Sequence, residues 1–532
     1  MNTAAIPKAP ASIRATLRHR GFRGLLTGGS IYFIGNAMQV MATAWLMIEL
    51  TGSSFLAALV QTAVFLPMFL LSLPAGVLAD TTDRSRLVQL ALWVQLAVVL
   101  VMAGMVLMGW AGATSLLLLT FLAGCCTALL SPSWNSAIAD VVPRDELPQA
   151  ITAIGISYNV ARALGPAIAG FVFTHAGSGW VFVLALMGVL ALLLSVRRHP
   201  PRPHPPSRLP AERLWGGVLS ALRFARHSDT VLAQLVRTGA YSAAGSALWA
   251  LLPVIGQRNL GVGATGYGFL IGCLGVGAVL AGLVMGRLRA RLGLERLVLI
   301  GTALYALAMA VTAVSRWPPA VYGALLVAGA CWMTVMSTYN TATQTSVPPW
   351  VRARATAMHT LCALGSFALA SAFWGAASDL IGLAPALGLA AAAMAAGLLL
   401  ARPFPLRTGD LQDVTQATLS EDLFVAYEPD PEAGPVAVEI GYRIDAKDAT
   451  SFLDALALMR APRKRDGATL WRAYRDLADP SRYVERFIVT SWADYLHQRA
   501  RATMADQEIE ARLREFLLPG EVPSMQHYIA ER

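Results

Sequence analysis

The chain has 532 residues, of which 56% are hydrophobic and only 14% are charged, and its mean hydropathy is +0.54. Soluble domains average about 45–50% apolar and about 25% charged residues, so this composition excludes a single soluble enzyme and a disordered chain. The five cysteines all fall in apolar stretches, which excludes a fold held together by disulfides.

The charges divide the chain into two parts. The first 402 residues carry 26 Lys/Arg and 10 Asp/Glu and are net +16, whereas the last 130 carry 16 and 22 and are net −6. The basic excess lies in short segments between apolar runs, which is typical of membrane proteins and not of nucleic-acid binding. We therefore expect a membrane domain followed by an acidic soluble domain.

Apolar runs of about 20 residues, enough to cross a bilayer, recur along the first part. They form two groups of six, so the predicted regions are an N-terminal bundle (1–196), a proline-rich linker (197–230), a C-terminal bundle (231–402) and a soluble domain (403–532). The twelve predicted membrane-spanning helices cover residues 23–49, 54–79, 87–109, 115–139, 149–173, 179–196, 231–255, 265–286, 296–315, 319–345, 351–377 and 383–402.

The basic residues predict the orientation. With the N-terminus inside, 22 Lys/Arg fall in segments predicted to be cytoplasmic, whereas the predicted outside loops hold only Arg258 and Arg316. Basic residues tend to remain on the cytoplasmic side, so both termini and the soluble domain are predicted to be cytoplasmic.

A short internal repeat supports two related bundles. The sequence Trp134–Ala137, followed by Val142-Pro143, recurs 205 residues later as Tyr339–Ala342, followed by Val347-Pro348. Two related bundles predict a cavity between them near the middle of the membrane, as alternating access requires.

The loop after the second predicted span contains Gly76, Asp80, Asp83 and Arg84. This pattern resembles the signature loop of the major facilitator superfamily, which implies that these four residues form a conformational latch. Two departures are Thr81, where a basic residue is common, and Asp83, where glycine is common. The alternative is a basic cytoplasmic loop without a latch role.

Further motifs occur along the first bundle, namely Trp45-Leu46, Glu49–Ser53, Leu66-Pro67, Pro74–Gly76 and Gly165–Gly170. These motifs are similar to those of one exporter branch of that superfamily, the transmembrane secretion effectors. The resemblance implies a secondary active exporter of an organic solute such as a siderophore or a drug, and it implies helix packing at Gly165, Pro166 and Gly170.

Polar side chains within the predicted spans are candidates for the substrate cavity. Arg162 lies near the middle of the fifth span, where an arginine costs about 2.5–3.5 kcal/mol on insertion scales. It either attracts an anionic or carbonyl-rich solute or binds the carbonyls of neighbouring helices. Asn36 and Gln39 share a helix face, and with Gln61 they either line the cavity or join helices.

Aromatic and amide side chains complete this set. Tyr158 and Asn340 are expected to offer an aromatic surface and hydrogen bonds to a bulky solute, although Asn340 also suits bundle packing. Trp134 and Tyr339 lie near the inner ends of their spans, where an aromatic belt is expected.

The resemblance implies proton coupling, for which the candidate groups are Glu49, Asp379 and His359. No carboxylate or imidazole lies clearly at the membrane centre, so the sequence identifies no coupling residue. There is no phosphate-binding loop, and we expect no direct use of ATP, no cofactor and no metal.

The soluble domain alternates predicted strands (436–444, 469–474, 483–490 and 524–529) with helices in the order βαββαβ, which predicts a ferredoxin-like α+β fold. Around Ser491–Leu496, with Arg499 and Arg501, it resembles antibiotic-biosynthesis monooxygenases. That resemblance makes Trp492 and His497 catalytic candidates, although a core tryptophan and a solvated histidine are the alternative. Our preferred role is homodimerisation or regulation.

The sequence thus predicts a carrier of the bacterial inner membrane rather than an enzyme, with a small-molecule solute and the lipid bilayer as its partners. Two other hypotheses remain open, namely a membrane-anchored monooxygenase and a non-transporting sensor built on a carrier scaffold.

Overall fold

The fold is described from a computed structural model, which describes residues 16–81, 84–143, 146–198, 225–406, 415 and 429–531. The chain divides into two compact units. The first contains most of the helical part, and the second consists of Pro210–Arg237, Tyr339–Thr360 and Ala401–Arg532, which include the C-terminal sheet.

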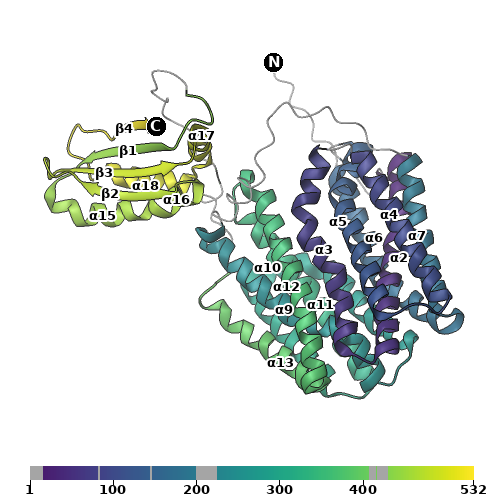
Figure 1. The fold of residues 1–532 in the computed structure, drawn as a ribbon. Coiled ribbons are helices and arrows are strands. Elements are labelled where there is room, and N and C mark those ends of the chain that lie inside the picture. The colour runs from purple at the N-terminus through teal and green to yellow at the C-terminus, as the bar shows by residue number, and fades with distance from the viewer. Residues whose placement is uncertain are drawn as a thin grey trace. The chain divides into compact units, whose positions relative to one another are not determined.

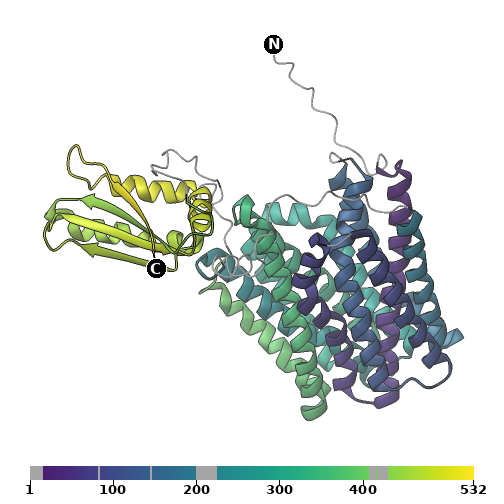
Figure 2. The same ribbon diagram turned by 45° about the horizontal axis from the view of Figure 1, so that its top comes forward.

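The helical part consists of long apolar helices that run side by side (Figures 1 and 2). Ten helices in the described part of the chain are long and apolar enough to cross a membrane. The N-terminal group is α2 (Arg20–Thr51), α3 (Ser54–Thr81), α4 (Arg84–Leu107), α5 (Ala113–Val141), α6 (Leu147–Ala176) and α7 (Ser178–Arg198). The C-terminal group is α9 (Asp229–Val254), the π-helix η1 (Ile255–Asn259), α10 (Ala264–Val314), α11 (Pro318–Thr345), α12 (Pro349–Ile381) and α13 (Leu383–Ala396) with the 3-10 helix η2 (Gly397–Ala401).

Helix α10 differs from the sequence prediction. It extends over 51 residues and contains the predicted span 265–286 and all but the last residue of the predicted span 296–315. The helical backbone is interrupted at Gly293, whose φ of 72° lies in the region that favours glycine. The two predicted spans therefore meet at a sharp break instead of being separated by an extended loop.

Small residues allow the helices of the N-terminal group to approach closely. A Cβ atom on Gly35 of α2 would lie 3.1 Å from the Cα atom of Ala185 on α7, and one on Gly188 would lie 3.0 Å from the carbonyl oxygen of Ile31. Such close approach gives helices in lipid their van der Waals contact.

Between residues 429 and 531, the C-terminal part forms a four-stranded antiparallel sheet with strand order β2-β3-β1-β4 and four α-helices (Figure 1). Along β1, Val436, Val438, Ile440 and Tyr442 are buried and alternate with less buried residues, so one face of the sheet packs on the helices. The elements are β1 (Val436–Arg443), α15 (Ala449–Leu458), α16 (Arg460–Asp466), β2 (Leu470–Arg475), β3 (Arg482–Val489), α17 (Trp492–Arg501), α18 (Met504–Arg514) and β4 (Ser524–Ile529).

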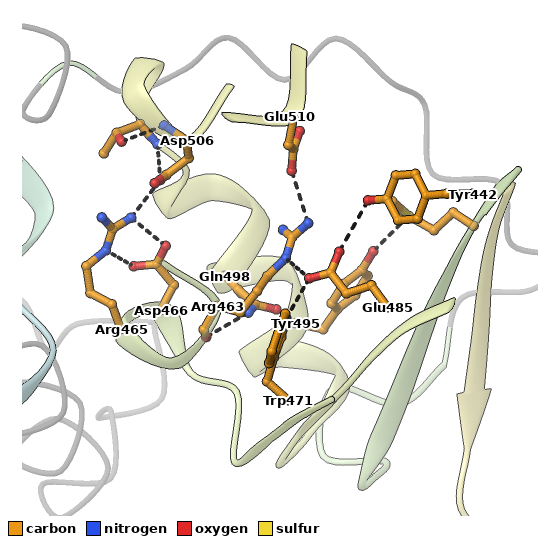
Figure 3. Close-up of polar contacts among 12 residues, drawn as sticks. Tyr442, Arg463, Arg465, Asp466, Trp471, Glu485, Tyr495, Gln498, Asp506 and Glu510 are labelled. Carbon is orange, nitrogen blue, oxygen red and sulfur yellow. Dashed lines mark hydrogen bonds and ion pairs between the residues drawn. The ribbon is translucent and has the colours of Figure 1, made fainter. Parts of the chain in front are cut away.

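A fully buried carboxylate lies between this sheet and its helices (Figure 3). Glu485 of β3 is 0% exposed and accepts hydrogen bonds from Arg463 Nε at 3.1 Å, Trp471 Nε1 at 2.9 Å and the Tyr442 hydroxyl at 3.3 Å. Arg463 also donates to Glu510 at 3.1 Å. Because a buried charge is costly unless it is paired and hydrogen-bonded, these donors make the burial of Glu485 possible.

A second ionic cluster joins α16 to the start of α18. Arg465 binds both carboxylate oxygens of Asp466, at 2.9 and 2.8 Å, and also binds Asp506 at 2.6 Å. Asp506 accepts the backbone N–H of Thr503 at 2.8 Å and so caps α18. Burial raises the pKa of Asp466 to about 6 although Arg465 favours the charged form.

Replacing Glu485 is predicted to destabilise the C-terminal domain. The change Glu485→Ala leaves the Arg463 guanidinium without a principal partner, and breaking a buried pair costs about 3–5 kcal/mol. In the full-length protein, we expect backbone amides of β1 and β3 to exchange hydrogen about 100-fold faster or more, as measured by mass spectrometry.

The matched control is Glu439→Ala on β1. Glu439 pairs with Arg486 at 3.4 Å, and their side chains are 27% and 44% exposed. Loss of this partly solvated pair should cost less than about 1 kcal/mol. Equal exchange rates in the two variants would contradict a special role for the buried pair.

Candidate functional site

The N-terminal and C-terminal groups of helices meet along α6 and α10 through small residues. A Cβ atom on Gly268 would lie 2.4 Å from the carbonyl oxygen of Pro166, and one on Gly275 would lie 2.5 Å from the Cα atom of Ala163. A Cβ atom on Gly170 would lie 2.4 Å from the carbonyl oxygen of Ala264. The two backbones are therefore in contact over about three turns.

Gly165 and Pro166 occupy two sides of α6. A Cβ atom on Gly165 would lie 2.8 Å from the Cβ atom of Ala37, so Gly165 faces α2, whereas the Pro166 carbonyl faces α10. This placement gives a physical reason for the predicted packing role of Gly165, Pro166 and Gly170.

Arg162 precedes the residues of α6 that contact α10, and its side chain extends to α9 in the C-terminal group of helices. Its guanidinium carbon is 5.1 Å from the centre of a Trp249 ring on α9, within the range of a cation–π interaction. Arg162 is half-buried, so the indole covers only part of the cation. A charge within the helical part is thus held between the two groups of helices by an aromatic face.

Trp249 belongs to an aromatic cluster that was not predicted from the sequence. Its ring centre lies 6.2 Å from that of Trp332, which lies 5.5 Å from Tyr241 and 5.8 Å from Phe367. Phe367 in turn lies 5.0 Å from Phe65 of α3, so the cluster also bridges the two groups. Tyr241 and Trp249 are eight residues apart on one helix face, which was the available signal.

The predicted polar residues of α2 and α3 have different environments. Asn36 and Gln61 are half-buried. Gln39 is buried, and its amide nitrogen lies 3.7 Å from the sulfur of Met102 on α4, as expected for a residue that joins helices.

Tyr158 and Asn340 lie on different helices and have different contacts. Tyr158 on α6 is 47% exposed and contacts Phe33 edge to face at 5.4 Å. Asn340 on α11 accepts a hydrogen bond from Gln344, one turn later, and lies in the second unit.

The proposed coupling groups have different contacts. Glu49 accepts a hydrogen bond from Trp45 Nε1 at 2.6 Å, and Asp379 accepts one from Ser53 Oγ at 2.7 Å. His359 is buried in α12.

Three of the four predicted latch residues lie in helices α3 and α4. Asp83 lies outside the described residues. Gly76 and Asp80 lie in α3 and Arg84 begins α4, but their side chains are outside the described set.

The two catalytic candidates of the C-terminal part differ in their exposure to solvent. Trp492 is 2% exposed and packs against Tyr495 at 5.4 Å, whereas His497 is exposed. The described residues contain no group of three His, Cys, Asp or Glu side chains suited to a metal ion.

Known families and proteins resemble this chain over most of its length. A family model described as transmembrane secretion effector matches residues 11–532. The multidrug efflux pump Tap of Mycobacterium tuberculosis (strain ATCC 25618 / H37Rv) is 28% identical over 407 residues, which cover 71% of this chain and 92% of Tap. The enterobactin exporter EntS of Escherichia coli O1:K1 / APEC is 24% identical over 335 residues, which cover 62% and 78%.

A solved structure shows the same fold in the helical part. The crystal structure of a bacterial homologue of the iron transporter ferroportin, in an inward-facing state, gives a TM-score of 0.57 at 17% identity. The match covers 73% of this chain and 99% of that one. The helical part therefore has the architecture of a membrane transporter.

Substitution in the α6–α10 contact is predicted to separate the helices. Gly268→Ala would place a methyl carbon 2.4 Å from the Pro166 carbonyl oxygen, and Gly275→Ala would place one 2.5 Å from the Cα atom of Ala163. Overpacking of this kind costs about 1–3 kcal/mol. We expect a lower midpoint of thermal unfolding for the purified protein in detergent.

Gly272→Ala is the matched control on the same face of α10. Its Cβ atom would lie 3.5 Å from the Ala163 carbonyl oxygen, an ordinary contact. Its unfolding midpoint should remain near that of the wild type. A similar loss of stability in all three variants would contradict the contact as described.

Proposed function

The chain belongs to the transmembrane secretion effector family of the major facilitator superfamily, and from this membership we propose that it exports an organic solute. The solute class we propose is a drug or a siderophore, since the similar proteins include a multidrug efflux pump and an enterobactin exporter. The observation that carries the proposal is the family match over residues 11–532. Membership of a transporter family also favours transport over catalysis.

We propose that twelve helices cross the membrane. The break at Gly293 supports two spans within α10, and α6 is a 30-residue helix packed among the apolar helices. Because 22 basic residues then lie on one side and only Arg258 and Arg316 on the other, we place both termini in the cytoplasm of a bacterium and the helices in its inner membrane. The domain limits 196, 230 and 402 belong to the same proposal.

The proposed solute site lies around Arg162 and the aromatic cluster. The guanidinium faces an indole at 5.1 Å. An anionic or carbonyl-rich group would bind it more strongly than the indole does, because charge-assisted hydrogen bonds add to the attraction. Asn36, Gln61 and Tyr158 are proposed as further polar contacts, while the burial of Gln39 suits helix joining better.

Two further roles follow from the family. We propose that a proton gradient drives export, and that Gly76, Asp80, Asp83 and Arg84 form a cytoplasmic latch. The basic side chains near the inner leaflet support the latch position.

We propose a ferredoxin-like fold and a dimerising or regulatory role for the C-terminal domain. The alternation of strands and helices and the sheet order β2-β3-β1-β4 support the fold. The sheet face opposite the helices carries Arg472, Tyr474 and Arg486 at exposed positions, and it offers a surface for a second copy.

Inside-out membrane vesicles test the export proposal and the role of Arg162 together. Energised vesicles that contain the protein should accumulate a substrate drawn from a panel of drugs and siderophores. Arg162→Gln should raise the KM about tenfold or more, because it removes the cation that attracts the solute. Arg162→Lys keeps the charge but lacks the planar guanidinium, so its KM should lie between those of the wild type and of Arg162→Gln.

Arg197→Gln is the matched control. Arg197 also lies 5.1 Å from a tryptophan ring, that of Trp93, but both residues belong to the N-terminal group. This variant should leave KM unchanged. Normal transport by both Arg162 variants at normal protein levels would exclude Arg162 from the solute site.

A further inference from the structure

The turn that joins α2 to α3 is held by two charged side chains from the C-terminal group of helices. Asp379 of α12 accepts hydrogen bonds from Ser53 Oγ at 2.7 Å, from the Ser54 backbone N–H at 2.8 Å and from the Phe55 backbone N–H at 3.0 Å. The first N–H groups of a helix have no partner within the helix. A carboxylate from the other group of helices therefore caps α3.

Arg258 of η1 holds the other side of the same turn. It donates to the carbonyl oxygen of Gly52, the C-cap of α2, and its second nitrogen lies 3.4 Å from Ser54 Oγ. An anion at a helix N-terminus and a cation at a helix C-terminus are both favourable in the field of the helix dipoles. Asp379 and Arg258 thus match the two helix ends that meet at this turn.

Close packing and other polar contacts support these bonds at the same end of the bundle. A Cβ atom on Gly375, one turn before Asp379, would lie 3.0 Å from the Cα atom of Phe55. Trp45 stacks on Tyr267 at 5.3 Å, and Thr265 Oγ1 donates to Thr174 Oγ1 at 2.9 Å. All of these contacts join the N-terminal group to the C-terminal group.

We propose that Asp379 and Arg258, with the turn Gly52–Phe55, form a polar clamp that closes the outer end of the transporter. This inference rests on the proposed function and orientation, which place the turn opposite the cytoplasmic termini. Alternating access requires the two groups of helices to separate at this end. The clamp must then release all of these hydrogen bonds in each cycle, and its strength sets the balance between closed and open outer states.

A cross-link tests whether this end must open. Ser53→Cys and Asp379→Cys are introduced together in a variant whose five native cysteines are replaced and which still transports. A short thiol-specific cross-linker should stop transport, and its reductive cleavage should restore it. The control pair Leu107→Cys and Gly179→Cys joins α4 to α7 at the same end but within one group, where a Gly179 Cβ atom would lie 2.3 Å from Leu107. Cross-linking the control should leave transport intact. Undiminished transport after the Ser53–Asp379 cross-link would overturn the proposal.

A labelling experiment tests the clamp without any transport measurement. Thr265→Cys serves as the reporter in right-side-out vesicles, with a membrane-impermeant maleimide added outside. Asp379→Ala and Arg258→Ala should each raise its labelling rate about fivefold or more, because hydrogen bonds to charged groups contribute over about 1 kcal/mol. Asp379→Asn, which keeps the shape and removes the charge, should raise the rate by a smaller factor.

Ser115→Ala is the control for a general loss of stability at this end. Ser115 accepts the backbone N–H of Gly112 at 3.0 Å and caps its own helix without reaching the other group. Its labelling rate should equal that of the reporter alone. Unchanged labelling in both clamp variants would overturn the clamp, whereas raised labelling in a protein that transports nothing from the panel would overturn the proposed function alone.

Discussion

Helices in a bilayer gain little from burying apolar side chains against one another, because the surrounding lipid is equally apolar. Their association depends on close van der Waals contact and on polar bonds, and this constraint explains where the chain places its small residues. Glycine and alanine line the contacts between α2 and α7 and between α6 and α10, where backbones approach to distances that no larger residue permits. The α6–α10 contact matters most, because it joins the two groups of helices.

Charged side chains have different kinds of partner in the two parts of the protein. In the C-terminal domain, Glu485 is surrounded by an arginine, an indole N–H and a phenol, so its charge is fully satisfied. In the helical part, Arg162 has an aromatic face as its described partner. A carboxylate partner would hold the cation firmly, whereas an indole leaves it able to exchange its contact for a solute. The first arrangement suits stability, and the second suits binding and release.

Much of the architecture follows from the sequence because hydropathy and length dictate helices in lipid. The observed ends of α2 and α7 lie within a few residues of the predicted spans 23–49 and 179–196, and the strands of the C-terminal domain follow their apolar alternation. Contacts between distant helices could not be predicted from the sequence. The approach of Trp249 to Arg162, of Gln39 to Met102 and of Asp379 to Ser54 depends on how helices pack and rotate, which apolar periodicity specifies only weakly where helices are apolar all round. The sequence predicted an interruption between the spans 265–286 and 296–315, but not that the helix continues as far as Gly293 before it breaks.

The short π-helix that ends α9 determines where Arg258 points. In this segment the backbone N–H of a residue donates a hydrogen bond to the carbonyl oxygen five residues earlier. The Leu260 N–H, for example, donates to the Ile255 carbonyl oxygen at 3.1 Å. This pattern accommodates one residue more than an α-helical turn would. Each residue of an α-helix rotates the chain by about 100°, so a sequence one residue shorter here would swing the guanidinium to another side of the rod. Loss of one residue from this segment would therefore displace Arg258 from the turn that it holds.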